Sequence, residues 1–261
     1  MARHRSQTIT SKQGLSAKRT TGELRPSPAL CLFVGTVAAA ALVIPPPAVA
    51  KGTSAPGTGR TATRDLGPPK YNRLPSAGTQ KICDGKTTVV RPGVTKVTVD
   101  HAKCDQAILG DINAAHKSEG IPPMTRPAGF EKWSPVEQLV WLVNAERTVR
   151  GLPALPEDKT YDAMARQALR AREDPAGPNG YIYGGVAASA QSSLDAMFEW
   201  MYDDGPGSLN PDCVPGDYWG CWAHRGHLLL NCPGEMGAAA GQGSYTVLVV
   251  CEKGYIPKGM Y

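Results

Sequence analysis

The sequence lacks the short motifs that mark several classes of enzyme. It contains no GxSxG elbow of a serine hydrolase, no HExxH helix of a zinc peptidase and no glycine-rich phosphate loop. It also contains no CxxC pair, the spacing typical of zinc and redox sites. The sequence therefore gives no support to these enzyme classes, and we expect neither catalysis nor a cofactor.

Phenylalanine and net charge are also scarce. Three Phe accompany 29 Gly and 23 Pro, which indicates a loop-rich chain with unfolded stretches. The formal charge of +5 comes from residues 1–50, which contain six basic side chains and one acidic side chain. The rest of the chain is neutral overall and has no net attraction for a phosphate backbone, so we expect no nucleic-acid partner.

An uncharged apolar run at residues 29–44 follows the basic N-terminus and indicates export. The run is shorter than the roughly 20 residues that span a bilayer. The small-x-small pattern of Ala48-Val49-Ala50 then suits signal peptidase. We predict a signal peptide in residues 1–50 and an extracellular or cell-surface protein. The alternative is an uncleaved signal anchor, which would obey the positive-inside rule and bring membrane contact.

Composition divides the remaining chain into three parts. Residues 51–78 are rich in Gly, Pro, Ser and Thr and are predicted to be a disordered linker. Residues 79–133 are predicted to form a small N-terminal segment. Within it, residues 86–100 read as two β-branched runs around a Pro-Gly turn, which predicts a hairpin, and a helix is expected at 105–118. Residues 134–261 are predicted to form the main domain.

Apolar periodicity predicts four helices and three strands in the main domain. Ser134 is placed as an N-cap and Glu137 completes a capping box, so the clearest helix begins there and ends at Gly151. Its predicted buried face consists of Val136, Leu139, Val140 and Val143. The other expected elements are helices at 161–172, from 193 and at 224–230, and strands at 181–188, 236–240 and 245–252. This order predicts an α/β (α+β) layered domain with an antiparallel sheet.

The cysteines predict a disulfide framework. Cys31 lies in the signal segment and is expected to take no part in the disulfide framework. The other six permit 15 pairings, so spacing alone does not fix the connectivity. We expect each cysteine to pair with its nearest partner along the chain, which gives Cys83–Cys104, Cys213–Cys221 and Cys232–Cys251.

Three motifs in the main domain resemble those of bacterial CAP domains (cysteine-rich secretory, antigen 5, pathogenesis-related). Residues 144–155 read NAERTVRGLPAL and resemble the NxxRxxxGLxxL motif, in which Arg147 is expected to pair with Glu146 or Glu235. Residues 220–229 resemble the GHRxNIL segment, and residues 235–241 resemble the EIGVG strand. The resemblance spans about 134–255 and implies an α-β-α sandwich with a small antiparallel sheet.

The resemblance also implies a cleft with two His and two acidic side chains that suit a divalent metal. His224 matches the second family histidine and Asp203 falls where a family glutamate sits, but Gly185 replaces the other acid and residues 168–178 contain no histidine. We therefore predict no metal site. The predicted binding cleft contains His224, Asp203, Tyr183, Gly185 and Trp222, with Gly185 either widening a pocket or allowing close packing.

The leading prediction of function is a non-catalytic extracellular binding module with a degenerate metal-site cleft. Lipid, sterol or cell-wall glycan are the partners that the resemblance implies. One alternative is a metal-assisted hydrolase that uses His224 and Asp203. The other is a structural surface protein displayed by an uncleaved anchor.

Overall fold

The computed structural model describes residues 69, 72–91, 94–208, 210–214, 216 and 220–255. The predicted signal segment, Cys31 and most of the predicted linker lie outside these residues, so those predictions stay predictions. Among the described residues, no helix has both the length and the apolar character needed to cross a membrane.

The N-terminal segment consists of a short helix, a hairpin and a long helix. The hairpin is confirmed, with β1 (Lys86–Arg91) antiparallel to β2 (Val94–Thr98). The long helix, α2 (His101–Glu119), begins four residues before the predicted start because the Asp100 side chain accepts a hydrogen bond from Lys103 N at 3.2 Å. The short helix, α1 (Ala77–Cys83), was not predicted, and its first residues belong to the segment expected to be linker.

Helix α3 (Pro135–Val149) has the predicted N-terminus and follows a single 3-10 turn, η1 (Phe130–Lys132). Ser134 and Glu137 form the capping box, with Ser134 N donating to the Glu137 carboxylate at 2.7 Å. The buried face is rotated from the predicted one, because Leu142, Glu146 and Arg147 are fully buried while Val136 and Val140 are half-buried. The predicted face omitted the two charged residues, which are buried because they have hydrogen-bond partners in the core.

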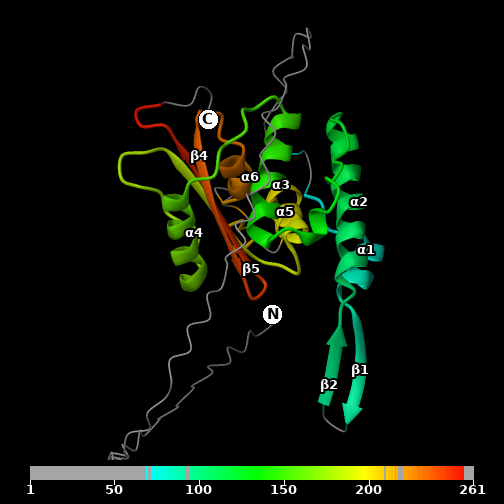
Figure 1. Cartoon of the computed structure of the whole chain (residues 1–261). Helices are drawn as coiled ribbons and strands as arrows, with labels where there is room; N and C mark the ends of the chain where they lie inside the picture. The colour runs from blue at the N-terminus through cyan, green and yellow to red at the C-terminus, as the bar shows by residue number, and fades with distance from the viewer. Residues whose placement is uncertain are drawn as a thin grey trace, which may run out of the picture. The chain divides into compact units, whose positions relative to one another are not determined.

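A three-stranded antiparallel sheet forms the centre of the main domain, in the order β3-β5-β4. The strands are β3 (Tyr183–Ser189), β4 (Gly234–Gly241) and β5 (Ser244–Cys251), close to their predicted positions. Helix α4 (Lys159–Ala171) packs on β4 and β5, and α3, α5 (Ser193–Tyr202) and α6 (Ala223–Leu228) lie on the other side (Figure 1). The predicted α+β layering is confirmed.

Helix α5 brings the core and the N-terminal segment together. The apolar side chains of α5 are fully buried, and they are Leu194, Met197, Phe198, Trp200 and Met201. The side of α5 away from the sheet packs against α2. The described part of the N-terminal segment is therefore packed onto the main domain.

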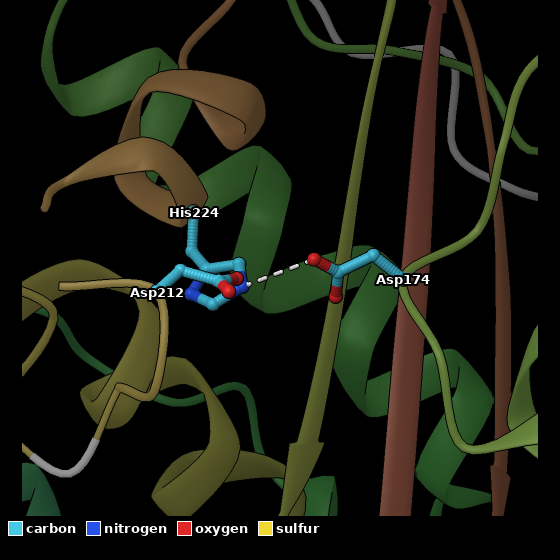
Figure 2. Close-up of side chains that lie close together, drawn as sticks. All are labelled: Asp174, Asp212 and His224. Carbon is cyan, nitrogen blue, oxygen red and sulfur yellow. Dashed lines mark hydrogen bonds and ion pairs between the residues drawn. The ribbon is translucent and has the colours of Figure 1, made fainter. Parts of the chain in front are cut away.

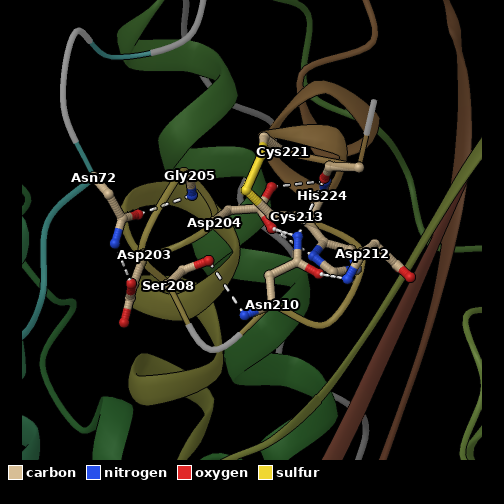
Figure 3. Close-up of a disulfide and its surroundings, with 11 residues drawn as sticks. Asn72, Asp203, Asp204, Gly205, Ser208, Asn210, Asp212, Cys213, Cys221 and His224 are labelled. Atoms are coloured by element: carbon tan, nitrogen blue, oxygen red, sulfur yellow. Dashed lines mark hydrogen bonds and ion pairs between the residues drawn. A yellow bond between two sulfur atoms is a disulfide. The ribbon is translucent and has the colours of Figure 1, made fainter. Parts of the chain in front are cut away.

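The structure contains the three predicted disulfides. Cys83–Cys104 joins α1 to α2 across the base of the hairpin, and Cys232–Cys251 joins the residues before β4 to the end of β5. Cys213–Cys221 closes the loop between α5 and α6 (Figure 3).

Candidate functional site

The buried carboxylate of Asp204 fixes the beginning of α6 (Figure 3). Trp222, which precedes the helix, has a left-handed backbone with φ of 65° and gives no side-chain cap. Asp204 supplies the cap from the end of α5, accepting hydrogen bonds from His224 N at 2.9 Å and Arg225 N at 3.3 Å. The same carboxylate binds His224 Nδ1 at 2.7 Å and the Asn210 amide at 2.7 Å. Asp204 therefore sets both the helix start and the orientation of the His224 ring.

Arg147 holds the other end of α6. Its guanidinium donates to the carbonyl oxygens of Leu228 at 2.8 Å, Leu230 at 2.9 Å and Pro153 at 3.0 Å. Among the described residues it forms no ion pair, so the predicted pairing with Glu146 or Glu235 was wrong. Backbone carbonyls left over at the end of a short helix take the place of the expected carboxylate.

A buried polar network joins α6 to the N-terminal segment. Arg225 donates to Met201 O at 2.8 Å and to the Glu119 carboxylate at 3.0 Å, and Arg150 donates to Glu119 at 2.7 Å. Arg150 also pairs with Glu146 of α3. The Glu146 carboxylate in turn binds His116 of α2 at 3.2 Å and Tyr202 of α5 at 2.9 Å. Burial would raise the pKa of Glu146, but Arg150 and His116 lower it to about 2. The network is thus ionised and charge-compensated.

A cavity of about 230 Å³ opens beside His224. Its lining comes from strand β3, from α5, from the loop that follows α5 and from α6. The lining residues are Ala187, Ser189, Glu199, Trp200, Asp203, Asp204, Asn210, Pro211 and His224. Trp200 is fixed by a hydrogen bond from Nε1 to Ala187 O at 3.0 Å. We call this cavity the His224 pocket.

Burial changes the protonation of the pocket. Burial, reinforced by repulsion from Asp195 and Asp203, raises the pKa of Glu199 to about 8. Burial likewise raises the pKa of Asp203 to about 6, although a hydrogen bond from Asn72 opposes the change. Burial would lower the pKa of His224, but hydrogen bonds with Asp174 and Asp204 overcome it and raise the pKa to about 10. At neutral pH the pocket holds a protonated Glu199 and an imidazolium paired with carboxylate.

The structure brings together two of the five residues predicted for the cleft. His224 and Asp203 line the His224 pocket, whereas Tyr183, Gly185 and Trp222 do not. A Cβ on Gly185 would lie 1.9 Å from Pro175 O, so close packing, the second of the two alternatives, describes this glycine. Tyr183 is 41% exposed on the surface. The Trp222 ring instead packs over Gly205, where a Cβ would be 2.3 Å away.

Three side chains beside the pocket form a candidate metal-binding group. One ligand atom from each of Asp174, Asp212 and His224 lies within 4.8 Å of the others, and His224 Nε2 is 3.4 Å from the Asp174 carboxylate (Figure 2). Sequence reasoning missed both aspartates and Asp204, because it looked for ligands only at family positions. Asp212 precedes Cys213, so a disulfide-closed loop was the available signal for it.

No protein-family model and no curated protein matches the chain. Among solved structures it resembles a cysteine-rich secretory protein from Staphylococcus aureus, with 17% identity, a TM-score of 0.34 and coverage of 49% of this chain and 41% of that one. An extracellular SCP-domain protein from Bacillus anthracis gives 15% identity, a TM-score of 0.34 and coverage of 50% and 45%. The hookworm platelet inhibitor gives 13% identity, a TM-score of 0.32 and coverage of 54% and 80%. The chain thus spans less than half the length of the two bacterial proteins.

Proposed function

We propose that the protein is an extracellular, non-catalytic binding module of the CAP type whose His224 pocket holds an uncharged, hydroxyl-bearing group, such as one sugar of a wall glycan. One observation carries this proposal. Glu199, Asp203, Asn210 and His224, which come from two helices and the loop between them, converge on a single cavity. A small concave site with a few placed polar groups is the usual form of a ligand pocket.

The disulfides support the extracellular location. All six cysteines among the described residues are paired, and disulfides persist in oxidising compartments rather than in the cytosol. One of the bacterial structures that the chain resembles is named as an extracellular protein. The motif resemblance described above points to the same class.

The chemistry of the pocket favours a neutral, hydrogen-bonding group. The Glu199 carboxyl group has no hydrogen bond or ion pair within the described part of the chain, and in its protonated form it both donates and accepts. The His224 imidazolium is balanced by the buried Asp204. The volume of 230 Å³ is below the range of about 300 to 1,000 Å³ for drug-sized ligands, which favours one sugar ring over a sterol or an acyl chain.

Calorimetric titration with N-acetylglucosamine, an uncharged wall sugar, tests the proposal. We expect millimolar binding at pH 7 that weakens about tenfold in Glu199→Ala. Glu199→Gln should retain most of the affinity, since an amide also both donates and accepts. Glu252→Ala, an exposed acid remote from the lining, is the matched control. Binding to vesicles of an uncharged lipid, with none to the sugar, would overturn the glycan assignment.

A second candidate function rests on the Asp174, Asp212 and His224 group. A carboxylate on Nδ1 orients a metal-ligating histidine in many zinc sites, and Asp204 occupies that position here. One nitrogen and two carboxylate oxygens fit a zinc site with three protein ligands. Bound zinc would activate a water molecule. In that case His224, after it releases its Nε2 proton to solvent, and the two aspartates would hold the ion, while Asp204 keeps Nε2 directed at it.

Zinc titration separates the two candidates. The metal proposal requires a stoichiometric site tighter than about 1 μM that is lost in Asp212→Asn and retained in Asp203→Asn. The change at residue 212 is on an exposed side chain, so loss of binding would not reflect unfolding. Binding weaker than about 10 μM, or loss in both variants, would reject the three-residue site.

A further inference from the structure

We infer that the His224 pocket continues past Glu199 into a second subsite, so that the ligand is a linear, neutral glycan of several units. The inference rests on the proposed function and extends it from one sugar to a chain. A second cavity, of about 580 Å³, lies next to the first. Ser189 and Glu199 line both cavities, so a ligand that occupies both would lie over these two residues. We call the second cavity the α1 subsite.

One face of α5 forms a continuous floor beneath both cavities. Asp195, Glu199 and Asp203 are spaced four residues apart, so their side chains follow one another along the same helix face. Asp195 lines the α1 subsite, Asp203 lines the His224 pocket and Glu199 stands between them. Burial raises the pKa of Asp195 as it does that of Glu199, so the buried floor disfavours the ionised form of both side chains.

The other wall of the α1 subsite comes from the N-terminal segment, which the family motifs do not cover. Thr79, Gln80 and Asp84 at helix α1 face the end of β3 across the cavity. The Cys83–Cys104 disulfide fixes α1 to α2. This subsite is therefore a feature of this chain's added segment rather than of the cleft implied by the resemblance.

Three hydrogen bonds hold the chain ahead of α1 against the wall of the His224 pocket. Asn72 donates to the Asp203 carboxylate at 2.5 Å and accepts from Gly205 N at 2.8 Å. Arg73 N donates to Tyr202 O at 2.8 Å. The N-terminal segment thus contacts the loop behind the first cavity and lines the second, which gives the two cavities a common, fixed geometry.

The lining of the α1 subsite selects for hydroxyl groups and against anions. Gln191 is exposed at its rim, and its side-chain amide has no hydrogen-bond partner among the described residues. The Gln80 amide donates to Pro75 O at 3.1 Å, which leaves its oxygen free to accept. Within the described residues neither cavity is lined by Lys or Arg, while Asp84 would repel phosphate or carboxylate on a ligand. The volume of the α1 subsite is within the range of about 300 to 1,000 Å³ for organic ligands.

Chain-length dependence of binding tests the inference on the full exported protein. Calorimetry would compare N-acetylglucosamine with its β1,4-linked tetramer. Occupation of both cavities makes the second contact intramolecular, so the tetramer should bind at least about tenfold more tightly than the monomer. Gln191→Trp and Gln80→Trp, each at an exposed position on the rim, should remove this gain and leave monomer affinity unchanged.

Gln167→Trp places the same bulky side chain on an exposed position of α4, outside both cavities, and should leave the gain intact. Thermal melting of the three variants checks that each is folded. Equal affinity for monomer and tetramer, or a gain that survives both rim variants, overturns the second subsite while the proposed function stands. Absence of binding to either sugar overturns the proposed function, and the inference falls with it.

Discussion

Replacing Asp204 by Asn keeps the size of the side chain but removes a charge that four donors share. The donors are the backbone N–H groups of His224 and Arg225, the His224 ring and the Asn210 amide. Asp204 is 1% exposed, so no water can replace the lost interactions. The variant therefore removes the counter-ion of a buried imidazolium and weakens the helix cap in one step.

The expected loss of unfolding free energy is about 3 to 5 kcal/mol at pH 7, the usual effect of removing one partner from a buried charge pair. A simple sum would be larger, since each hydrogen bond to a charged group contributes about 1.5 to 3 kcal/mol. Asn retains an acceptor oxygen for the backbone N–H groups, so the smaller range applies. Urea denaturation followed by circular dichroism measures the difference.

The pH dependence gives an independent check. The pKa of His224 is raised from 6.5 to about 10, so the folded state binds a proton more tightly than the unfolded chain. The resulting stabilisation is complete below pH 6.5 and is lost as the pH rises through 10. In the Asp204→Asn variant the pKa falls toward its ordinary value, so stability should decline less steeply between pH 6.5 and 10. Asp174 remains as a partner and leaves part of the slope.

Asp203→Asn is the matched control, because it makes the same change one residue earlier. Asp203 is half-buried and bonded only to Asn72 among the described residues, and Asn keeps an oxygen that accepts this bond, so the loss of unfolding free energy should be at most about 1 kcal/mol. Glu199 and Asp203 also titrate near this pH window. Comparing both variants with the parent protein over the same range separates the contribution of these two groups to the pH dependence of stability from that of His224. Equal losses in the two variants, or an unchanged pH slope in Asp204→Asn, would refute the role assigned to Asp204.

Three further predictions follow from burial and connectivity. Gly185→Ala should destabilise the protein by about 1 to 3 kcal/mol in thermal melts, because the new Cβ clashes with the carbonyl oxygen of Pro175. Gly226→Ala, at an exposed position of α6, should be neutral or stabilising by up to about 1 kcal/mol. Glu146→Gln should destabilise by about 3 to 5 kcal/mol in urea denaturation, because it removes one of the two carboxylates that compensate the buried Arg150. Non-reducing peptide mapping should link Cys213 to Cys221, and a link from Cys213 to another half-cystine would contradict the structure.

The elements of the main domain were predictable because their signals are local. A capping box marks the start of α3, and an apolar i, i+3, i+4, i+7 pattern marks the buried face of α5. The hairpin of β4 and β5 was indicated by two apolar runs joined by Gly241–Ser244. These features depend only on residues that are close in the sequence, so they can be predicted without knowledge of the tertiary structure.

Helix α1, which the sequence did not predict, and the start of α2, which was predicted four residues too late, both depend on single caps. Helix α1 has few apolar residues and begins with Ser76, whose side chain accepts from Thr79 N at 3.2 Å. Helix α2 begins at Asp100 for the same reason. A lone Ser or Asp in a polar stretch fits a turn as well as a helix start, so composition favoured a linker there.

The site was only half predictable, because its carboxylates lie in loops without periodicity. The family resemblance favoured Asp203, and the structure does place this residue in the pocket. The end of α5 instead directs Asp204 inward onto α6, while Asp203 turns toward Asn72. Two adjacent aspartates are equivalent in a motif, and only the backbone at the helix end distinguishes them. Asp174 and Asp212 approach His224 from separate loops, so chain distance concealed them.

The motif region does not hold its site in place alone. Glu119 of α2 accepts from Arg225, the residue next to His224, and Asn72 holds the carboxylate of Asp203. Both contacts come from residues outside the stretch that carries the family resemblance. Since an unpaired Arg225 would be a buried charge, the main domain requires α2 for its charge balance as well as for its packing. Because Glu119 of α2 compensates the buried Arg225, the N-terminal segment is fixed against the main domain. This fixed position allows the attached helix α1 to line the second cavity, the α1 subsite.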